Sequence, residues 1–402
     1  MTETRIHAID PLAGRPELNL ISNGQAPQSR LLHEARRRGS VKIFAAAIDR
    51  TLGDFLTRNI YAAAVKMHFS DAWLAFYYRD DRPYKKDLVA INPYIDQRVV
   101  VHGDNAAAID LFYDAGDRHP LPYSVDFRRR GLADPDILLV PSMMIVQDLL
   151  RFDRYPMFKI PIDRSSALEG RLVELGLDPG KWFCCIFYRQ GSFVGRGQAA
   201  YRDVDDGSFE VLTRHIVADL GGQVVRLGHS AMRPWDIGKG FVDLSRLESE
   251  FLTHATAVSL ARFMISTLSG PAHLPGAFDV PYAIANAMSV WGVWKSKDLI
   301  LPGHLVDPNG ARIDLSWLID HGHFNLNSLR NLTERRGCRL IDNTAGELCA
   351  LADMLHDATT DCPGWRRSVP PPPPPPPNVF SFPQPYRRKV NIVEFPQHWP
   401  QI

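Results

Sequence analysis

The chain has 402 residues, of which 45% are hydrophobic and 23% are charged. This composition is that of a water-soluble globular protein, and the length favours two domains over one. The formal net charge of +1 excludes a strong overall field that would attract nucleic acid, so any bound anion must be held by particular arginines or helix ends. The five cysteines are odd in number and include no CxxC pair, which argues against a disulfide framework and a structural zinc site.

The N-terminal sequence and the lengths of the apolar runs predict where the protein is located in the cell. Residues 1–20 are polar and interrupted by proline and glycine, unlike a secretory signal. The longest apolar runs, such as residues 41–48, are too short to span a bilayer. We therefore expect a cytoplasmic protein with no transmembrane segment, and peripheral attachment to the inner membrane remains open.

The first half of the chain predicts one α/β domain. Residues 1–40 are expected to form a leader of loop and short helix. Beyond them, a short apolar run, a glycine turn at Gly53, a stretch of apolar residues at helical spacing from Phe55 and a second apolar run make a βαβ unit. Strands are predicted at 41–48, 72–78, 98–101 and 137–141. We expect a Rossmann-like domain over residues 41–170.

A second α/β block follows and predicts a second domain over residues 171–360. Its helix at 208–220 ends at Gly221-Gly222, as helices commonly do. Strands are predicted at 182–187, 223–227, 263–266 and 282–285. The predicted fold class is therefore α/β of the GT-B type, with two Rossmann-like domains facing one another across a central cleft.

Residues 361–402 differ from the rest because they contain an unbroken proline run at 370–377. Such a run favours polyproline II, either as a stiff spacer or as a docking peptide for a partner. Apolar residues near the end could fold the last stretch back onto the body of the protein: Val390, Ile392, Val393, Phe395 and Trp399.

Asp54 is the candidate catalytic residue. It follows the glycine turn at Gly53, at the start of a helix, where open parallel sheets bind ligands and where the helix favours an ionised carboxylate. Asp54 either caps this helix or acts as general base on an acceptor hydroxyl. Arg58, one helical turn further on, could contact an anionic group of acceptor or donor.

Arginines at strand ends are the candidate phosphate ligands. Arg189 follows one buried strand and Arg226 lies at the end of the next, so both are expected at one edge of the sheet. A guanidinium binds phosphate well because its planar fork donates two hydrogen bonds together. The alternative for each is a salt bridge at the rim. Arg202 is a weaker third candidate.

The turn after the predicted strand at 263–266 is the third constellation. Small hydroxyl residues and glycine precede a short helix whose backbone N–H groups could bind an anion or simply be capped. The candidate ligands of the donor phosphates here are Ser266, Thr267, Ser269, Gly270 and His273. His229, after the preceding strand, flanks the same region.

Metal and dinucleotide sites are not expected. Asp203-Val-Asp205 has a DxD form, but it stands directly before a predicted helix, with Asp206-Gly207-Ser208 resembling a cap, so a metal is not expected there. His321 and His323 lie in a polar loop. The sequence contains no GxGxxG fingerprint and no P-loop, which disfavours an NAD enzyme or an NTPase. We expect no cofactor and no metal, with the nucleotide sugar as a substrate.

Segments 220–228 and 263–271 resemble a family of bacterial proteins assigned as glycosyltransferases, and this likeness extends from residue 41 to about residue 305. The Ser269-Gly270 turn also resembles the donor-site turn of the heptosyltransferases, which have the GT-B fold. Their first glycine turn, with its acidic residue, resembles Leu52-Gly53-Asp54 here.

This resemblance implies that Asp54 is the catalytic base and that Arg226 and the Ser269-Gly270 turn lie on the nucleotide-diphosphate side of the site. Heptosyltransferases usually carry an Asn-Asp or similar pair before the glycine turn, where this chain has Thr267-Leu268-Ser269. The donor therefore need not be an ADP-heptose. The proline-rich tail has no counterpart in that family.

The resulting hypothesis is an inverting, metal-independent glycosyltransferase of cell-surface polysaccharide or glycoconjugate biosynthesis. It would transfer a sugar from a nucleotide-diphosphate donor to an unknown glycan, lipid-linked, protein or small-molecule acceptor. Two alternatives stay open. One is a sugar-nucleotide epimerase or a pyruvyltransferase-like enzyme of the same fold, and the other is a non-catalytic protein that binds a nucleotide sugar or a partner.

Overall fold

The computed structural model describes residues 4–9, 41–47, 51–67, 72–100, 137–139, 156–190, 203–247, 249–289, 298–359, 364–366 and 390–401. The chain divides into two compact units. Unit 1 comprises Met1–Pro11, Ile162–Ser368 and Arg388–Ile402, and unit 2 comprises Leu12–Pro161 and Val369–Arg387. The predicted boundary at residue 170 falls inside a helix, and the units divide before that helix begins.

Unit 2 contains a four-stranded parallel sheet with the order β4-β3-β2-β5. Its elements are β2 (Val41–Ala47), α3 (Leu52–Met67), β3 (Ala72–Tyr78), α4 (Pro83–Ala90), β4 (Gln97–Val100) and β5 (Ile137–Leu139). The predicted βαβ unit is confirmed, because β2 and β3 pair in parallel along their whole length. Helix α3 is buried on nearly every side, which agrees with its run of alanine and other apolar residues.

Unit 1 contains an eight-stranded sheet with the order β1-β14-β11-β10-β9-β6-β7-β8, in which only β1 is antiparallel to its neighbour. Its strands are β1 (Arg5–Ile9), β6 (Phe183–Phe187), β7 (Gln223–Arg226), β8 (Phe241–Asp243), β9 (Met264–Thr267), β10 (Tyr282–Ala287), β11 (Leu299–Pro302) and β14 (Val390–Glu394). The central strands are buried on both faces, as the continuous apolar runs of the sequence predicted.

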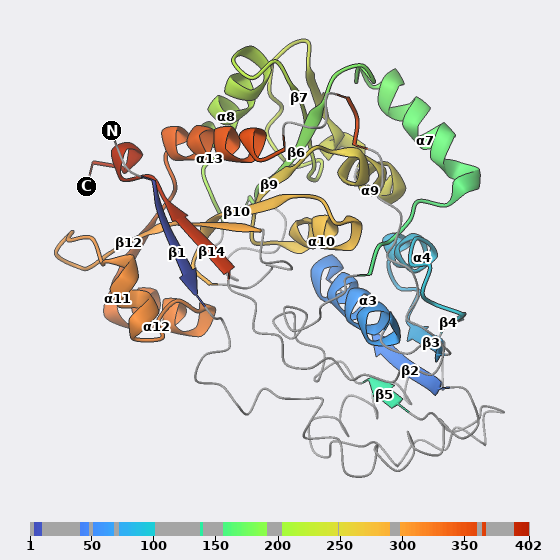
Figure 1. The fold of residues 1–402 in the computed structure, drawn as a ribbon. Helices are drawn as coiled ribbons and strands as arrows, with labels where there is room; N and C mark the ends of the chain where they lie inside the picture. The colour runs from blue at the N-terminus through green and yellow to red at the C-terminus, as the bar shows by residue number, and fades with distance from the viewer. Residues whose placement is uncertain are drawn as a thin grey trace. The chain divides into compact units, whose positions relative to one another are not determined.

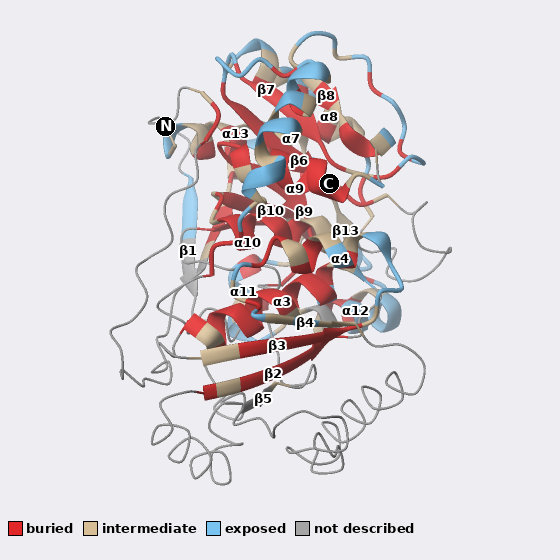
Figure 2. Cartoon of the chain, turned by 90° about the vertical axis from the view of Figure 1, so that its right-hand side faces the viewer, coloured by how far each residue is buried: buried red, intermediate tan, exposed pale blue. Residues whose placement is uncertain are grey.

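Helices pack on both faces of this sheet (Figure 1). Helices α8 (Gly207–Ala218) and α13 (Ala345–Asp357) lie side by side on one face and share the main hydrophobic core with β6 and β9. Helices α7 (Ile162–Glu174), α9 (Phe251–Leu260) and α10 (Leu274–Phe278) pack together on the other. Figure 2 shows that α9 and α10 are buried and that most of α7 is exposed.

A histidine bridges α8 to α13. His215 contacts Asp219 at 2.8 Å and, across the two helices, Asp353 at 2.7 Å. Burial lowers the pKa of His215, but the hydrogen bonds to these two carboxylates outweigh burial and raise it above its ordinary value. The protonated side chain therefore stabilises the contact between the helices.

The two ends of the chain meet in the sheet of unit 1. Residues Arg5–Ile9 form β1 and pair antiparallel with β14, so the expectation of only loop and short helix before residue 41 is wrong for this segment. Strand β14 in turn pairs in parallel with β11. Ile392, Val393 and Phe395 are buried, which confirms that the end of the tail folds back onto the body. The proline run itself lies outside the described residues.

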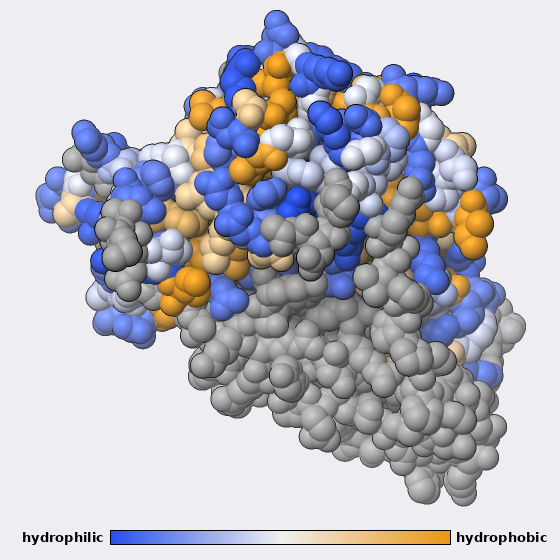
Figure 3. Space-filling model, turned by 45° about the horizontal axis from the view of Figure 1, so that its top comes forward, coloured by the Kyte–Doolittle hydropathy of each residue, from blue (hydrophilic) through white to orange (hydrophobic). Residues whose placement is uncertain are grey.

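A small lobe stands between β11 and α13. It contains β12 (His304–Val306), α11 (Leu315–Asp320), α12 (Leu326–Arg336) and β13 (Arg339–Ile341), around a core of its own. Within the described ranges, no helix has both the length and the apolar character that crossing a membrane requires. On the face shown in Figure 3, hydrophilic and hydrophobic residues are interspersed over the described part of the surface.

Candidate functional site

The strand order of unit 1 marks a ligand-binding edge. The chain proceeds from β6 outward through β7 to β8, then returns to β9 on the other side of β6. This reversal is the topological switch point of a Rossmann-type sheet, and ligands of such sheets bind outside the carboxyl ends of the two strands that flank it. In unit 1 these strands are β6 and β9.

Arg189 and Thr267 join the two strand ends at this point. The backbone N–H of Arg189 donates a hydrogen bond of 3.0 Å to the hydroxyl oxygen of Thr267. The guanidinium of Arg189 lies 3.1 Å from a carboxylate oxygen of Asp203, and its side chain is 9% exposed. Arg189 therefore lies at the switch point with its guanidinium oriented by Asp203, and its contact with a phosphate stays a prediction.

The partner of Arg189 is Asp203, which the sequence pattern assigned only to a weak metal-binding motif. Asp203 pairs with Arg189, while Asp205 accepts a 3.1 Å hydrogen bond from the N–H of Gly207 at the start of α8. Asp206 is the N-cap residue of α8, as predicted, but its side chain makes no capping hydrogen bond. Among the described residues no group of three or more His, Cys, Asp or Glu side chains is placed to hold a metal ion.

The turn after β9 has the predicted small residues in an extended and then 3-10 conformation. Ser269 is extended, and its carbonyl accepts a hydrogen bond of 3.1 Å from the N–H of Ala272. The 3-10 segment Gly270–His273 leads directly into α10, and His273 is 9% exposed. Ser269, Gly270 and His273 therefore follow the end of β9, and whether they contact a phosphate stays a prediction.

The prediction that Arg226 binds a donor phosphate does not fit its surroundings. Arg226 is completely buried. Its guanidinium donates to both carboxylate oxygens of Asp243, to the hydroxyl of Tyr188 at 3.0 Å and to the carbonyl of Arg233 at 2.9 Å. It also lies over the ring of Trp235, 4.3 Å from the centroid. Since the protein itself uses these donors, Arg226 has a structural role.

Ser266 also differs from the expectation. It is fully buried, and its hydroxyl lies 2.8 Å from the hydroxyl of Tyr282 inside the sheet, so it faces the core and not a ligand. His229 follows β7, and whether it contacts a ligand stays a prediction. Successive side chains of a strand point to opposite faces of the sheet, and the sequence alone does not show which face Ser266 takes.

An acidic and basic network surrounds the start of α8. Arg233 donates to Asp206 at 2.9 Å and to Glu210 at 2.7 Å. Burial raises the pKa of Asp206, but hydrogen bonds from Arg233 and Trp235 outweigh burial and hold the pKa below its ordinary value. These carboxylates make the start of α8 unsuitable for an anion. The network meets Arg226 at Arg233, whose carbonyl accepts a hydrogen bond from the Arg226 guanidinium.

In unit 2, Asp54 lies near the corresponding switch point of the parallel sheet. The order β4-β3-β2-β5 has its switch point between β2 and β5, and α3 follows β2. Asp54 is exposed in the first turn of α3, where Thr51 donates its hydroxyl to the carboxylate and accepts the N–H of Asp54 at 3.3 Å. The carboxylate thus takes part in capping and remains accessible. Gly53 is buried and Arg58 half-buried on α3, and Arg202 lies outside the described residues.

The fold thus defines an α/β protein with two Rossmann-type parallel sheets. No protein-family model matches the chain, and no curated protein matches it. Solved structures do match at low identity, and heptosyltransferases are among them.

A glycosyl transferase family 9 protein from Veillonella parvula DSM 2008 is 12% identical with a TM-score of 0.45, over 65% of this chain and 86% of that one. The E. coli ADP-heptose lps heptosyltransferase II is 14% identical with a TM-score of 0.42, over 71% and 98%. The dodecameric iron-containing heptosyltransferase TibC, solved with ADP-D-beta-D-heptose, is 15% identical with a TM-score of 0.37, over 80% and 77%. At these identities and TM-scores the similarity assigns no activity to this chain.

Proposed function

We propose that this protein is a glycosyltransferase that binds a nucleotide-diphosphate sugar at the switch point of unit 1. The observation that carries the proposal is the contact between the carboxyl ends of β6 and β9. There the backbone N–H of Arg189 is hydrogen-bonded to Thr267, and Asp203 orients the Arg189 guanidinium. A guanidinium at the carboxyl edge of a Rossmann-type sheet is suited to a diphosphate, and it would stabilise the charge of the leaving group without a metal.

Asp54 is the proposed general base. Its carboxylate is exposed at the corresponding edge of the sheet in unit 2. In the proposed reaction it accepts the proton of an acceptor hydroxyl, the acceptor oxygen bonds to the anomeric carbon, and the bond from that carbon to the diphosphate oxygen breaks. One carboxylate acting as a base predicts inversion at the anomeric carbon.

The donor site is tested by thermal stability in the presence of GDP, UDP, ADP, dTDP and CMP. A ligand that binds only the native state raises the melting temperature by mass action. We expect one nucleotide to raise it in the wild type and in Arg330→Ala, a control on the exposed face of α12, and to lose this effect in Arg189→Ala. If every nucleotide effect survives in Arg189→Ala, the proposed donor site is wrong.

The base is tested with Asp54→Asn, which keeps the oxygen that accepts from Thr51 but removes the charge. We expect donor binding to be retained and release of the nucleoside diphosphate to fall at least about 100-fold, as for other general bases. The control is Thr51→Ala, which weakens the cap by about 0.5–2 kcal/mol but leaves the carboxylate. Near-normal turnover in Asp54→Asn would exclude the assignment, and turnover of the donor without any acceptor would favour an epimerase.

A further inference from the structure

A cavity lies in unit 1, away from the switch point. It measures about 130 Å³ and is bounded by the end of β11, by β12, by the segment before α11, by the start of α13 and by the end of β14. That is roughly ten times the volume that a single ordered water needs. Strand β10 stands between β9 and β11, so the two sites are separated by about 10 Å along the sheet.

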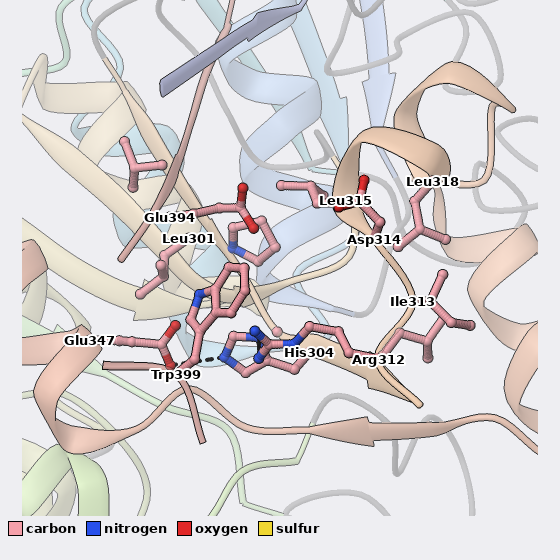
Figure 4. Close-up of a pocket in the computed structure, with 14 residues that line it drawn as sticks. Leu301, His304, Arg312, Ile313, Asp314, Leu315, Leu318, Glu347, Glu394 and Trp399 are labelled. Carbon is pink, nitrogen blue, oxygen red and sulfur yellow. Dashed lines mark hydrogen bonds and ion pairs between the residues drawn. The ribbon is translucent and has the colours of Figure 1, made fainter. Parts of the chain in front are cut away.

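Three side chains form a hydrogen-bonded row along one side of this cavity. Arg312 donates from Nη2 to Nδ1 of His304 at 2.6 Å, and Nε2 of His304 lies 2.9 Å from Oε2 of Glu347. A guanidinium can only donate, so Nδ1 accepts and the ring hydrogen is on Nε2, which donates to Glu347. Figure 4 shows this row beneath the ring of Trp399, with Glu394 on the opposite side. Each donor in this row therefore points the same way, from Arg312 to His304 and from His304 to Glu347.

Three buried polar atoms on side chains that line the cavity have no hydrogen-bond partner among the described residues. They are Oε1 of Glu347, Nε of Arg312 and Nε1 of Trp399. Glu347 has no exposed surface, and its other oxygen accepts from His304 and, in the capping box of α13, from the N–H of Thr344 at 2.9 Å. Leaving a buried carboxylate oxygen without a donor is destabilising, and more so because the group is charged.

The set of unpartnered atoms defines what can bind. It contains one acceptor and two donors, so a hydroxyl group, which both donates and accepts, is complementary to it. Among the described residues that line the cavity, Asp314 and Glu394 add two carboxylates to that of Glu347, against one guanidinium, and this excess of negative charge disfavours an anion. The walls are otherwise apolar and suit the C–H groups of a ring.

We propose that this cavity is a binding site for a neutral sugar ring, distinct from the nucleotide-sugar site of the proposed function. One hydroxyl of the ring donates to Oε1 of Glu347 and accepts from Nε1 of Trp399. One face of the Trp399 ring is covered by the guanidinium of Arg312, whose central carbon lies 3.7 Å from the ring centroid. The sugar is therefore recognised by the N–H edge of the indole and not by stacking on that face.

The test measures binding of free sugars without any nucleotide, by saturation-transfer NMR and by melting temperature. The panel contains glucose, galactose, mannose, N-acetylglucosamine and glycerol, with inorganic phosphate and ethylamine as charged probes. The variants are Trp399→Phe, which removes the N–H, and Glu347→Gln, which places an amide NH2 where Oε1 was while its oxygen keeps the contacts of Oε2. Trp317→Phe, at an exposed tryptophan of α11, is the control.

We expect at least one neutral sugar to bind the wild type and Trp317→Phe equally. Binding should be about 3- to 10-fold weaker in Trp399→Phe, the effect of one hydrogen bond, and at least tenfold weaker in Glu347→Gln. Trp399→Phe alone decides the matter if Glu347→Gln fails to fold. The same affinity in Arg189→Ala would separate this site from the nucleotide site.

The proposal is overturned by any of three results. The first is that no sugar of the panel binds the wild type. The second is that sugar binding is unchanged in Trp399→Phe. The third is that phosphate or ethylamine, and no neutral sugar, gives the signal that depends on Trp399. None of these results bears on nucleotide binding at Arg189, so a failure here leaves the proposed function standing.

Discussion

Replacing Arg226 with alanine should destabilise unit 1 without removing a ligand contact. The side chain is completely buried, and it donates to Asp243, to Tyr188 and to the carbonyl of Arg233. Alanine would leave the carboxylate of Asp243 without its guanidinium in a largely buried place, where the side chain is only 18% exposed. The variant therefore removes one partner of an ion pair and leaves the charge of the other partner uncompensated in a largely buried place.

The magnitude follows from that geometry. Breaking a buried ion pair by removing one partner costs about 3–5 kcal/mol, and loss of the cation–π contact with Trp235 adds about 1 kcal/mol. The two contributions share one side chain and do not add fully, and the residual exposure of Asp243 reduces the first. We expect the free energy of unfolding to fall by about 3 kcal/mol. Arg330→Ala removes an exposed pair with Glu334 and should change it by less than about 0.5 kcal/mol.

The effect of Arg226→Ala should depend on pH in a defined direction. Burial raises the pKa of Asp243, but hydrogen bonds from Arg226 and Ser245 outweigh burial and hold the pKa below its ordinary value. A carboxyl whose pKa is lower in the folded state stabilises it above the unfolded pKa of about 3.9, and this stabilisation is lost as the pH falls through the folded pKa. The stability difference between wild type and Arg226→Ala should therefore be full near pH 7 and shrink below about pH 4.

Urea denaturation followed by far-UV circular dichroism, at neutral and acidic pH, measures this difference. Nucleotide-dependent stabilisation, measured on the same variant, separates structure from ligand binding. If Arg226→Ala unfolds at the wild-type urea concentration and has lost nucleotide binding, then Arg226 is a phosphate ligand and its structural assignment is refuted.

Three further predictions concern stability. In Gly222→Ala the new methyl would lie 2.3 Å from the ring of Trp182, so the melting temperature should fall and the free energy of unfolding should drop by about 1–3 kcal/mol. The control is Gly170→Ala, within α7, where no atom lies close to the new methyl and the free energy of unfolding should rise by about 0.5–1 kcal/mol. Deleting residues 390–402 removes β14 with its buried side chains, and the remaining chain should lose its cooperative urea transition. Because the pKa of His215 is raised in the folded state, its stabilisation is present below about pH 6.5 and lost as the pH rises through the folded pKa, so the deficit of His215→Gln in urea should be larger at pH 6 than at pH 9. A deficit that is independent of pH would contradict this.

Much of the fold could be predicted because its strands are buried on both faces. Continuous apolar runs such as those of β2, β3 and β6 have no other common explanation in an α/β chain, and the structure has these strands within one residue of the predicted ends. Helix α9 was missed because it is buried almost all round, so its apolar residues show no helical period. Strand β1 was missed because its partner, β14, lies almost 400 residues further along the chain.

The site was harder to predict because the sequence shows which residues stand at strand ends but not which groups already occupy them. Arg189 and Arg226 were equivalent in the sequence, each at the end of a buried strand of one sheet. They differ in the position of the carboxylate that binds each of them. Asp243, from β8, binds Arg226 in the interior, and Asp203 binds Arg189 at the edge of the sheet. The position of each acid, and not the arginine itself, decides whether the guanidinium lies in the interior or at the edge of the sheet. For the same reason the cavity beside Trp399 could not be predicted, since its row of Arg312, His304 and Glu347 exists only because β12 and α13 fold against the returning C-terminal strand.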